Sequence, residues 1–143
     1  MKNPLKDLHR SAQVIENLQT ILLVDDSFEN NYLTKYILKL EGINAIVQEV
    51  NNGKQALDYI RVYGFPDVIF LDICMPQMDG FEFLLALKAM HVPVQSKIFI
   101  LSSSIYEWEI EKFVETGLVA DYFEKPFESS YIPVMLQKIA AKN

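Results

Sequence analysis

The chain is poor in the features that would place it outside the cell or in a membrane. Its 143 residues include one cysteine, Cys74, so no internal disulfide can form. No apolar stretch approaches the roughly 20 residues of a membrane-spanning helix, and no apolar block follows the charged N-terminus as in a signal peptide. We therefore expect a soluble, cytoplasmic protein with no membrane insertion.

Basic charge is also scarce. Thirteen lysines and arginines stand against nineteen aspartates and glutamates, which gives a net charge of −6. The basic residues form no run and no arginine-rich helix. A protein that follows a nucleic-acid backbone needs such a basic surface, so we expect no direct nucleic-acid partner.

Short apolar runs alternate with helical patterns along the chain. At this length, and with 50% hydrophobic residues, one domain with a real core is expected. The alternation is typical of a doubly wound parallel sheet. We predict an α/β fold with a five-stranded parallel sheet in the order 2-1-3-4-5 and five helices. The predicted strands are residues 20–24, 45–50, 68–71, 97–101 and 120–123.

Two of the helical patterns have apolar residues at helical spacing, one before the first predicted strand and one after it. Residues 1–19 form an N-terminal extension whose apolar residues recur at helical spacing, so it is either a short amphipathic helix or a loose arm. The domain itself is expected to span residues 20–143. After Ser27, a helix is expected to carry five apolar residues on one side until Gly42 stops it: Tyr32, Leu33, Tyr36, Ile37 and Leu40.

Polar residues follow four of the predicted strands. Asp72 ends the wholly apolar run of residues 68–71, Asp25 and Asp26 end the first run, Ser102 follows the fourth and Lys125 the fifth. Strands 1 and 3 are neighbours in this topology, where open α/β sheets bind ligands, so the three acids should meet. Clustered acids repel unless a cation neutralises them. Oxygen ligands favour a hard ion, which indicates Mg²⁺.

Each of these residues alone has an ordinary structural explanation. A lone aspartate or serine after a strand is more often a helix cap, and a lone lysine is usually a surface residue. Because all of these residues are expected at the carboxyl edge of the same sheet, a joint chemical role is favoured over these separate structural ones. Asp72 would be a nucleophile for phosphoryl transfer, Lys125 would stabilise the transferred group's oxygens, and the Ser102 hydroxyl would donate to one of them. The product would be an aspartyl phosphate.

The sequence resembles the CheY-like receiver domain of the bacterial two-component response regulators. The resemblance covers Thr20 to the C-terminus, and it implies the flavodoxin-like receiver fold. Four motifs in this order carry it: LLVDD (22–26), IFLDICMPQMDGFEFL (69–84), ILSS (100–103) and DYFEKPF (121–127). The family commonly has a cis peptide before the matching proline, so Lys125-Pro126 is a candidate.

The resemblance also implies roles for single residues. Asp72 would be the phospho-acceptor and Asp26 a direct Mg²⁺ ligand, while Asp25 would hold metal-bound water. The backbone carbonyl of Cys74 would complete the protein ligands to the metal. Lys125 would contact the phosphate.

Two further positions match the switch pair of the family. Ser102 stands where threonine is more frequent, and Tyr122 is the matching aromatic residue. A tyrosine at a strand edge is often only half-buried packing, so the structural interpretation of Tyr122 stays open. On the helix before this strand, Phe113 is expected in the core, and Tyr106 or Trp108, if exposed, would indicate a partner face.

The function that this resemblance implies is a stand-alone response regulator receiver. It would take phosphate from a sensor histidine kinase or a histidine phosphotransfer protein, depend on Mg²⁺, and switch binding to a downstream protein. The last predicted helix reaches the end of the sequence, so the response is expected to pass through another protein. No enzymatic turnover is expected beyond self-phosphorylation and self-dephosphorylation.

Three alternatives remain. One is an intermediate phosphate carrier in a phosphorelay. Another is an aspartyl phosphatase of the haloacid dehalogenase type, which usually has a second aspartate two residues after the nucleophile, where this chain has Cys74. The third is an interaction module without phosphorylation, which the intact set of five site residues argues against. Cys74 is expected to be a passive free thiol, and a redox role is a minor hypothesis.

Overall fold

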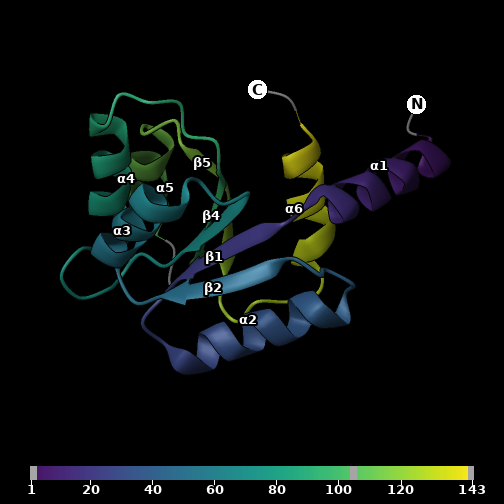
Figure 1. Ribbon diagram of the computed structural model, residues 1–143, viewed down its shortest axis with the longest axis horizontal. Coiled ribbons are helices and arrows are strands. Elements are labelled where there is room, and N and C mark those ends of the chain that lie inside the picture. Colours follow the sequence, from purple (N-terminus) through teal and green to yellow (C-terminus); the bar gives the residue numbers. More distant parts are fainter. Residues whose placement is uncertain (1–2, 104–105, 142–143) are drawn as a thin grey trace.

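The computed structural model describes residues 3–103 and 106–141. In these ranges the element order is α1 (Pro4–Asn17), β1 (Thr20–Val24), α2 (Phe28–Leu40), β2 (Ile46–Val50), α3 (Gly53–Tyr63), β3 (Val68–Leu71), α4 (Gly80–Ala89), β4 (Lys97–Ser102), α5 (Glu107–Val114), β5 (Val119–Glu124) and α6 (Tyr131–Ala140). All strand pairs are parallel, and the order is β2-β1-β3-β4-β5 (Figure 1). The predicted sheet topology is confirmed, and α1 adds a helix to the five predicted for the domain.

The helices cover both faces of the sheet. One core cluster joins the sheet to α2 and α6, with α1 packed at its margin, and the other joins it to α3, α4 and α5. Figure 1 shows the same two groups on either side of the strands. Because both faces are covered, the central strands can be apolar throughout, and all four residues of β3 are buried.

The register of the sheet aligns the ends of the two central strands. Val24 of β1 pairs with Leu71 of β3. The next residue in each chain segment is an aspartate, Asp25 and Asp72. The two carboxylates therefore leave the sheet side by side at its carboxyl edge, where the topology predicts a ligand site.

Local signals explain where several helices begin and end. The Ser27 side chain accepts a hydrogen bond from the Asn30 amide and caps α2. Gly42, with φ of 81°, follows the end of that helix. Asp79 forms a capping box with Glu82 at the start of α4. Pro133 lies in the first turn of α6, where a proline is tolerated because the amide hydrogen it lacks would have no partner within the helix.

The N-terminal extension is helical over Pro4–Asn17, and α1 packs against α6 (Figure 1). Val14 and Ile15 contact the core, whereas Leu5 and Leu8 are exposed. The Asp67 carboxylate accepts hydrogen bonds from the amides of Gln19 (2.8 Å) and Thr20 (3.1 Å). These bonds attach the junction between α1 and β1 to the segment that precedes β3.

None of the five apolar residues expected on one side of α2 is fully buried. The buried residues of this helix are Asn31, Thr34 and Leu38, whereas Tyr32, Tyr36 and Leu40 are exposed. The other two residues of the predicted face, Leu33 and Ile37, are partly buried. Asn31 and Thr34 can face the sheet because their polar groups are satisfied: the Asn31 amide donates to the Asp25 carbonyl, and the Thr34 hydroxyl donates to the Asn30 carbonyl of the same helix.

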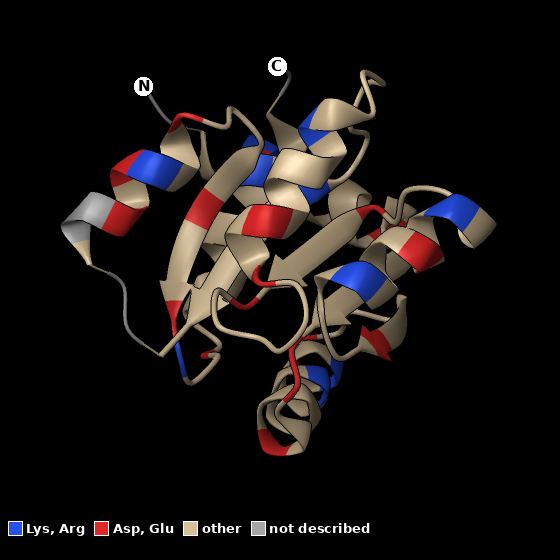
Figure 2. Ribbon diagram, turned by 90° about the vertical axis from the view of Figure 1, so that its left-hand side faces the viewer, with Lys and Arg blue, Asp and Glu red and all other residues tan. Residues whose placement is uncertain are grey.

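Phe113 of α5 is buried in the core as predicted, and Tyr106, the N-cap residue of this helix, is exposed. The side chain of Trp108 and residues 142–143 of the predicted domain lie outside the described part of the structure. None of the described helices is long and apolar enough to cross a membrane. In the view of Figure 2, acidic and basic residues are mixed over the helices; the expectation about nucleic acid stays a prediction.

Candidate functional site

Asp72 lies directly after β3 and is 7% exposed. Its backbone amide donates to the Val24 carbonyl at 2.9 Å, which continues the pairing of the two central strands. The Ile73 amide donates to Asp72 Oδ1 at 2.9 Å. The backbone therefore fixes the carboxylate in a nearly buried position at the end of the strand.

The loop after Asp72 returns to the site through a glycine. The Gly80 amide donates to the Ile73 carbonyl at 2.9 Å. A Cβ atom at Gly80 would overlap the Asp72 carbonyl oxygen. Only glycine permits this close backbone approach, so Gly80 holds the loop against the residue that carries the carboxylate.

Asp25 and Asp26 supply the other acids. Asp25 is buried, its Oδ1 accepts from the Ser27 amide at 2.9 Å, and its carbonyl accepts from Asn31 Nδ2 at 3.1 Å. Asp26 is exposed. Carboxylate oxygens of Asp25, Asp26 and Asp72 all lie within 4.8 Å of one another. The three predicted acids are therefore together, with one of them open to solvent.

Lys125 inserts its ammonium group among these carboxylates. Its Nζ lies 2.7 Å from Asp25 Oδ2 and 3.4 Å from Asp72 Oδ1, and all three side chains are nearly buried. The Lys125 amide donates to the Ser102 carbonyl at 2.8 Å, which ties the segment after β5 to the end of β4. The Lys125-Pro126 peptide is cis, as predicted.

The acid cluster perturbs the proton equilibrium of Asp72. Burial, and then the neighbouring Asp25 charge, raise its pKa from 3.8 to about 6, while Lys125 and the Ile73 amide oppose the rise. At neutral pH the carboxylate is ionised but poorly neutralised by its surroundings. A site of this kind attracts additional positive charge.

Hard divalent cations fit this donor set. Carboxylate oxygens from loops at a sheet edge are the ligands that Mg²⁺ prefers, and a cation would relieve the repulsion that raises the Asp72 pKa. Asp25, Asp26 and Asp72 are the side chains that could hold it. The exposed Asp26 leaves that flank open to solvent and to a phosphate.

Ser102 and Tyr122 lie on the two strands beyond Asp72. Ser102 ends β4 and is buried, next to the segment that carries Lys125. Tyr122 is partly buried in β5, and its hydroxyl donates to the Ile110 carbonyl of α5 at 3.1 Å. The tyrosine thus joins the strand beside the site to a surface helix.

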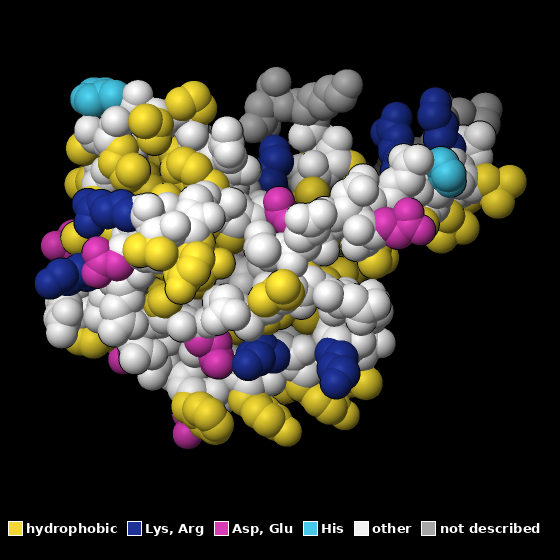
Figure 3. Space-filling model, in the orientation of Figure 1, with side chains coloured by type: hydrophobic (Ala, Val, Ile, Leu, Met, Phe, Trp, Pro, Cys, Tyr) yellow, Lys and Arg dark blue, Asp and Glu magenta, His cyan; other side chains and the backbone are white. Residues whose placement is uncertain are grey.

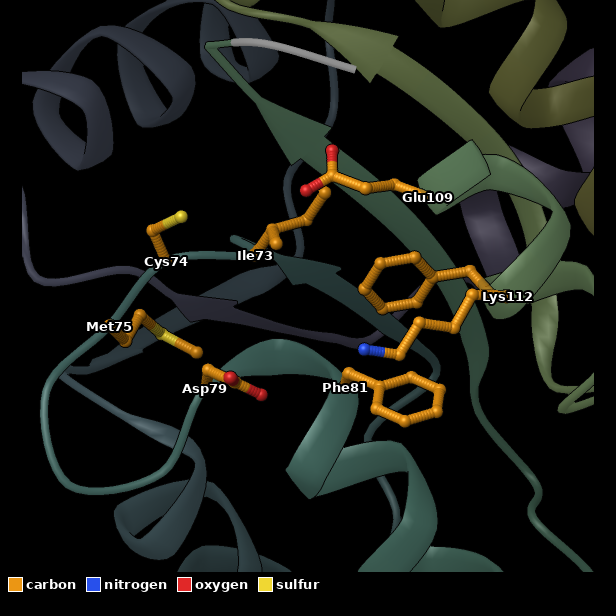
Figure 4. Close-up of a pocket in the computed structure, with 8 residues that line it drawn as sticks. Ile73, Cys74, Met75, Asp79, Phe81, Glu109 and Lys112 are labelled. Carbon is orange, nitrogen blue, oxygen red and sulfur yellow. The ribbon is translucent and has the colours of Figure 1, made fainter. Parts of the chain in front are cut away.

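A cavity of about 360 Å³ opens beside the site, between the β3–α4 loop and α5. Figure 4 shows Cys74, Met75 and Asp79 on the loop side and Glu109 and Lys112 on α5. The Lys112 ammonium lies 3.8 Å from the centroid of the Phe81 ring, a cation–π contact between α5 and α4.

Cys74 is an exposed free thiol at the edge of this cavity. Partial desolvation and the nearby Asp72 charge raise its pKa. A raised pKa disfavours the reactive thiolate, which agrees with the expected passive thiol.

Two residues that orient the site were not predicted. Asn31 holds the Asp25 backbone and Gly80 permits the close approach of the loop. The available signal for Asn31 was an asparagine six residues after Asp25, on the helix that Ser27 caps.

The geometry defines a doubly wound α/β domain with an acid cluster and a lysine at its switch point. The family model described as "Response regulator receiver domain" matches residues 21–137. The chain is 36% identical over 124 residues to "Two-component response regulator 24" of Arabidopsis thaliana, covering 87% of this chain and 86% of that protein. This chain therefore belongs to the response regulator receiver domain family.

Other similar proteins are consistent with this membership. "Transcriptional regulatory protein CpxR" of Escherichia coli (strain K12) is 32% identical over 126 residues, which are 88% of this chain but only 51% of CpxR. The chain thus spans about half the length of that relative.

Solved structures agree with the fold. A two-component response regulator from Cytophaga hutchinsonii aligns with a TM-score of 0.79 at 26% identity, covering 85% of this chain and 96% of that chain. The Mn²⁺-bound form of response regulator Rcp1 aligns with a TM-score of 0.66 at 26% identity, covering 85% and 91%.

Proposed function

We propose that this receiver accepts a phosphoryl group on Asp72, with Mg²⁺, from a histidine kinase or a histidine phosphotransfer protein. The observation that carries the proposal is the placement of the Asp72 carboxylate between two acids and the Lys125 ammonium. Such a site would hold a metal ion at the three acids, and the Lys125 ammonium already lies 3.4 Å from the Asp72 carboxylate. The negative charge on the oxygens of a phosphoryl group bound there would be stabilised by both the metal ion and the Lys125 ammonium.

Asp25, Asp26 and Asp72 would hold the ion, together with the Cys74 backbone carbonyl by resemblance to the family. The bound ion would neutralise the acids and the charge on the phosphoryl oxygens. The Mn²⁺-bound form of the neighbour Rcp1 supports a divalent cation in this fold. The chain's own contribution is to fix the Asp72 oxygen through the Ile73 amide and to keep it nearly buried.

The transfer itself is a simple displacement. An Asp72 carboxylate oxygen attacks the phosphorus, and the bond from phosphorus to the donor's nitrogen breaks with its electron pair remaining on the donor. Lys125 contacts the phosphoryl oxygens as the acyl phosphate forms. Hydrolysis by water regenerates the carboxylate, so the chain is a signalling switch rather than an enzyme with an external substrate.

The phosphorylated state would be transmitted through Ser102 and Tyr122. The new phosphoryl oxygens would offer an acceptor to the Ser102 hydroxyl and draw Ser102 inward, and Tyr122 would follow. Because the Tyr122 hydroxyl is bonded to α5, its movement would change the surface of α5, β5 and α6. That surface would bind the downstream protein in the cytoplasm.

Metal dependence tests the proposed function. Incubation with Mg²⁺ and acetyl phosphate is expected to add about 80 Da to the intact protein, the mass of one phosphoryl group. The same mixture with EDTA in place of Mg²⁺ should show no addition, and Asp26→Asn should require more Mg²⁺ because one ligand charge is lost. Addition that is equal with and without metal would contradict the assigned role of the acids.

The hydrogen bond from the Tyr122 hydroxyl to α5 can be tested by removing the hydroxyl. Tyr122→Phe is expected to accept phosphate like the parent but to lose the bond to Ile110, at a cost of about 0.5–1.5 kcal/mol of unfolding free energy. Hydrogen exchange in α5 should be faster in this variant. Unchanged exchange in α5 would show that the hydroxyl does not restrain the helix.

The alternative functions have less support. The family match does not favour a phosphatase of the haloacid dehalogenase type, and multiple turnover on an organic phosphate would be needed to support it. A phosphorelay carrier uses the same site chemistry. Return of the phosphoryl group to a histidine phosphotransfer protein would distinguish the carrier from a terminal receiver.

A further inference from the structure

The outer face of α2 carries a row of large apolar side chains that the sheet does not bury. Phe28, Tyr32, Tyr36 and Leu40 follow one another at intervals of four residues, and each is between 53% and 74% exposed. Residues at this spacing form one ridge on a helix surface, the element that packs into the groove of another helix. Figure 3 shows hydrophobic side chains in a row along the lower edge of the molecule, over α2.

The row borders a groove between α2 and the edge strand β2. This groove has a volume of about 240 Å³ and is lined by Phe28, Tyr32, Lys35, Tyr36, Lys39 and Glu49. The Phe28 and Tyr32 rings stack with their centroids 6.4 Å apart, and Lys35 is paired with Glu49 at 3.2 Å. An exposed apolar row with a polar margin is typical of an interaction surface.

The order of side chains on α2 is nearly symmetric about Thr34. Reversing the helix direction places Phe28 on the position of Leu40, Tyr32 on that of Tyr36, and the acidic Glu29 on that of the basic Lys39. Two copies related by a twofold axis meet in this way. Apolar residues would then face apolar residues, and each glutamate would face a lysine.

The charges at this face favour a second copy over a partner of strongly acidic or basic character. Glu29 and Glu49 balance Lys35 and Lys39, so the local charge is neutral in a chain whose net charge is −6. The net negative charge of such a chain disfavours the approach of another copy. A locally neutral, self-complementary face is where two copies can approach.

We propose that two copies of this chain associate through α2, with the two helices antiparallel and crossing at about −50°, the angle of packed i, i+4 ridges. Tyr32 and Tyr36 lie at the centre of this interface, and Glu29 and Lys39 lie at its ends.

Sedimentation velocity over a range of concentrations tests the association. The parent chain of 16.5 kDa is expected to show a reversible monomer–dimer equilibrium. Tyr32→Glu and Tyr36→Glu should each raise the dissociation constant at least about tenfold, because each places a charge at the interface centre. Tyr63→Glu is the matched control, since Tyr63 is also an exposed tyrosine but lies at the end of α3. It should dimerise like the parent.

A charge exchange tests the antiparallel orientation. Glu29→Lys and Lys39→Glu should each weaken the dimer, because each single change places like charges together at both ends. The double variant E29K/K39E should recover most of the parent affinity. Circular dichroism melts confirm that each variant is folded, and both positions are exposed.

Three outcomes would overturn the proposal. One is a parent chain that stays monomeric up to roughly 1 mM, the weak end of specific association. The second is a dimer unaffected by Tyr32→Glu, or equally affected by Tyr63→Glu. The third is a monomer in which Tyr32→Glu slows only phosphoryl transfer from a donor protein, which would assign the face to that donor.

Discussion

Replacing Asp72 by asparagine is expected to abolish phosphoryl acceptance and, at the same time, to stabilise the folded protein at neutral pH. Asparagine keeps the shape of the side chain but has no carboxylate oxygen to form the acyl phosphate. The stability gain follows from the raised pKa of Asp72, since ionising this residue costs more in the folded chain than in the unfolded one.

The effect of Asp72 on the stability of the folded chain depends on pH through the ionisation of its carboxyl group. Below pH 3.8 the acid is protonated in both states and costs nothing, and above about 6 the full cost is present. The contribution of Asp72 to stability therefore falls as pH rises through this window. The rise in pKa corresponds to about 1–3 kcal/mol once screening by solvent at the site is allowed for.

Urea unfolding in EDTA at pH 4, 5 and 7 measures the difference. Asp72→Asn should gain stability over the parent as the pH rises, by about 1–3 kcal/mol at neutral pH. Asp58→Asn is the control, because Asp58 is an exposed aspartate on α3 whose pair with Arg61 lies at the surface. If Asp72→Asn is less stable than the parent at pH 7, burial and Asp25 do not dominate the environment of this carboxylate.

Lys125→Gln is expected to slow phosphoryl transfer to Asp72 without weakening the binding of Mg²⁺. The ammonium group lies among the carboxylates and would contact the transferred phosphoryl, so its loss should slow phosphorylation by about 10²–10³-fold. Removing a positive charge from the acid cluster also leaves Asp25 and Asp72 less neutralised. Mg²⁺ should then bind as tightly as in the parent or more tightly.

The two effects are measured on the same variant. Phosphorylation rates come from intact mass at several times with acetyl phosphate, and Mg²⁺ affinity comes from isothermal titration. Lys88→Gln, an exposed lysine on α4, should match the parent in both. A loss of Mg²⁺ affinity in Lys125→Gln would mean that the lysine shapes the metal site and does not act mainly on the phosphoryl group.

The sequence predicts the sheet well because its strands are distinctive. A strand buried on both faces, such as Val68–Leu71, must be apolar throughout, and the acid that follows it then marks the carboxyl edge. The right-handed crossovers leave few possible strand orders. Asp25, Asp26, Asp72 and Lys125 could therefore be placed at one edge from their positions along the chain.

What the sequence could not show depends on contacts between distant segments. The apolar residues of α2 do not mark its buried face, because Asn31 and Thr34 face the sheet with their polar groups hydrogen-bonded to backbone carbonyls, which sequence periodicity does not show. The bond from Tyr122 to the Ile110 carbonyl depends on how α5 lies against β5. The need for glycine at position 80 appears only once the loop returns to the Asp72 backbone.

The most direct test of the account is the location of the phosphoryl group. The protein is incubated with Mg²⁺ and acetyl phosphate, reduced with borohydride to convert an acyl phosphate on aspartate into homoserine, digested, and sequenced by mass spectrometry. The account predicts homoserine at position 72, formed only with Mg²⁺ and phosphodonor. Conversion at another aspartate, or none at position 72 when the intact mass has increased, would contradict it.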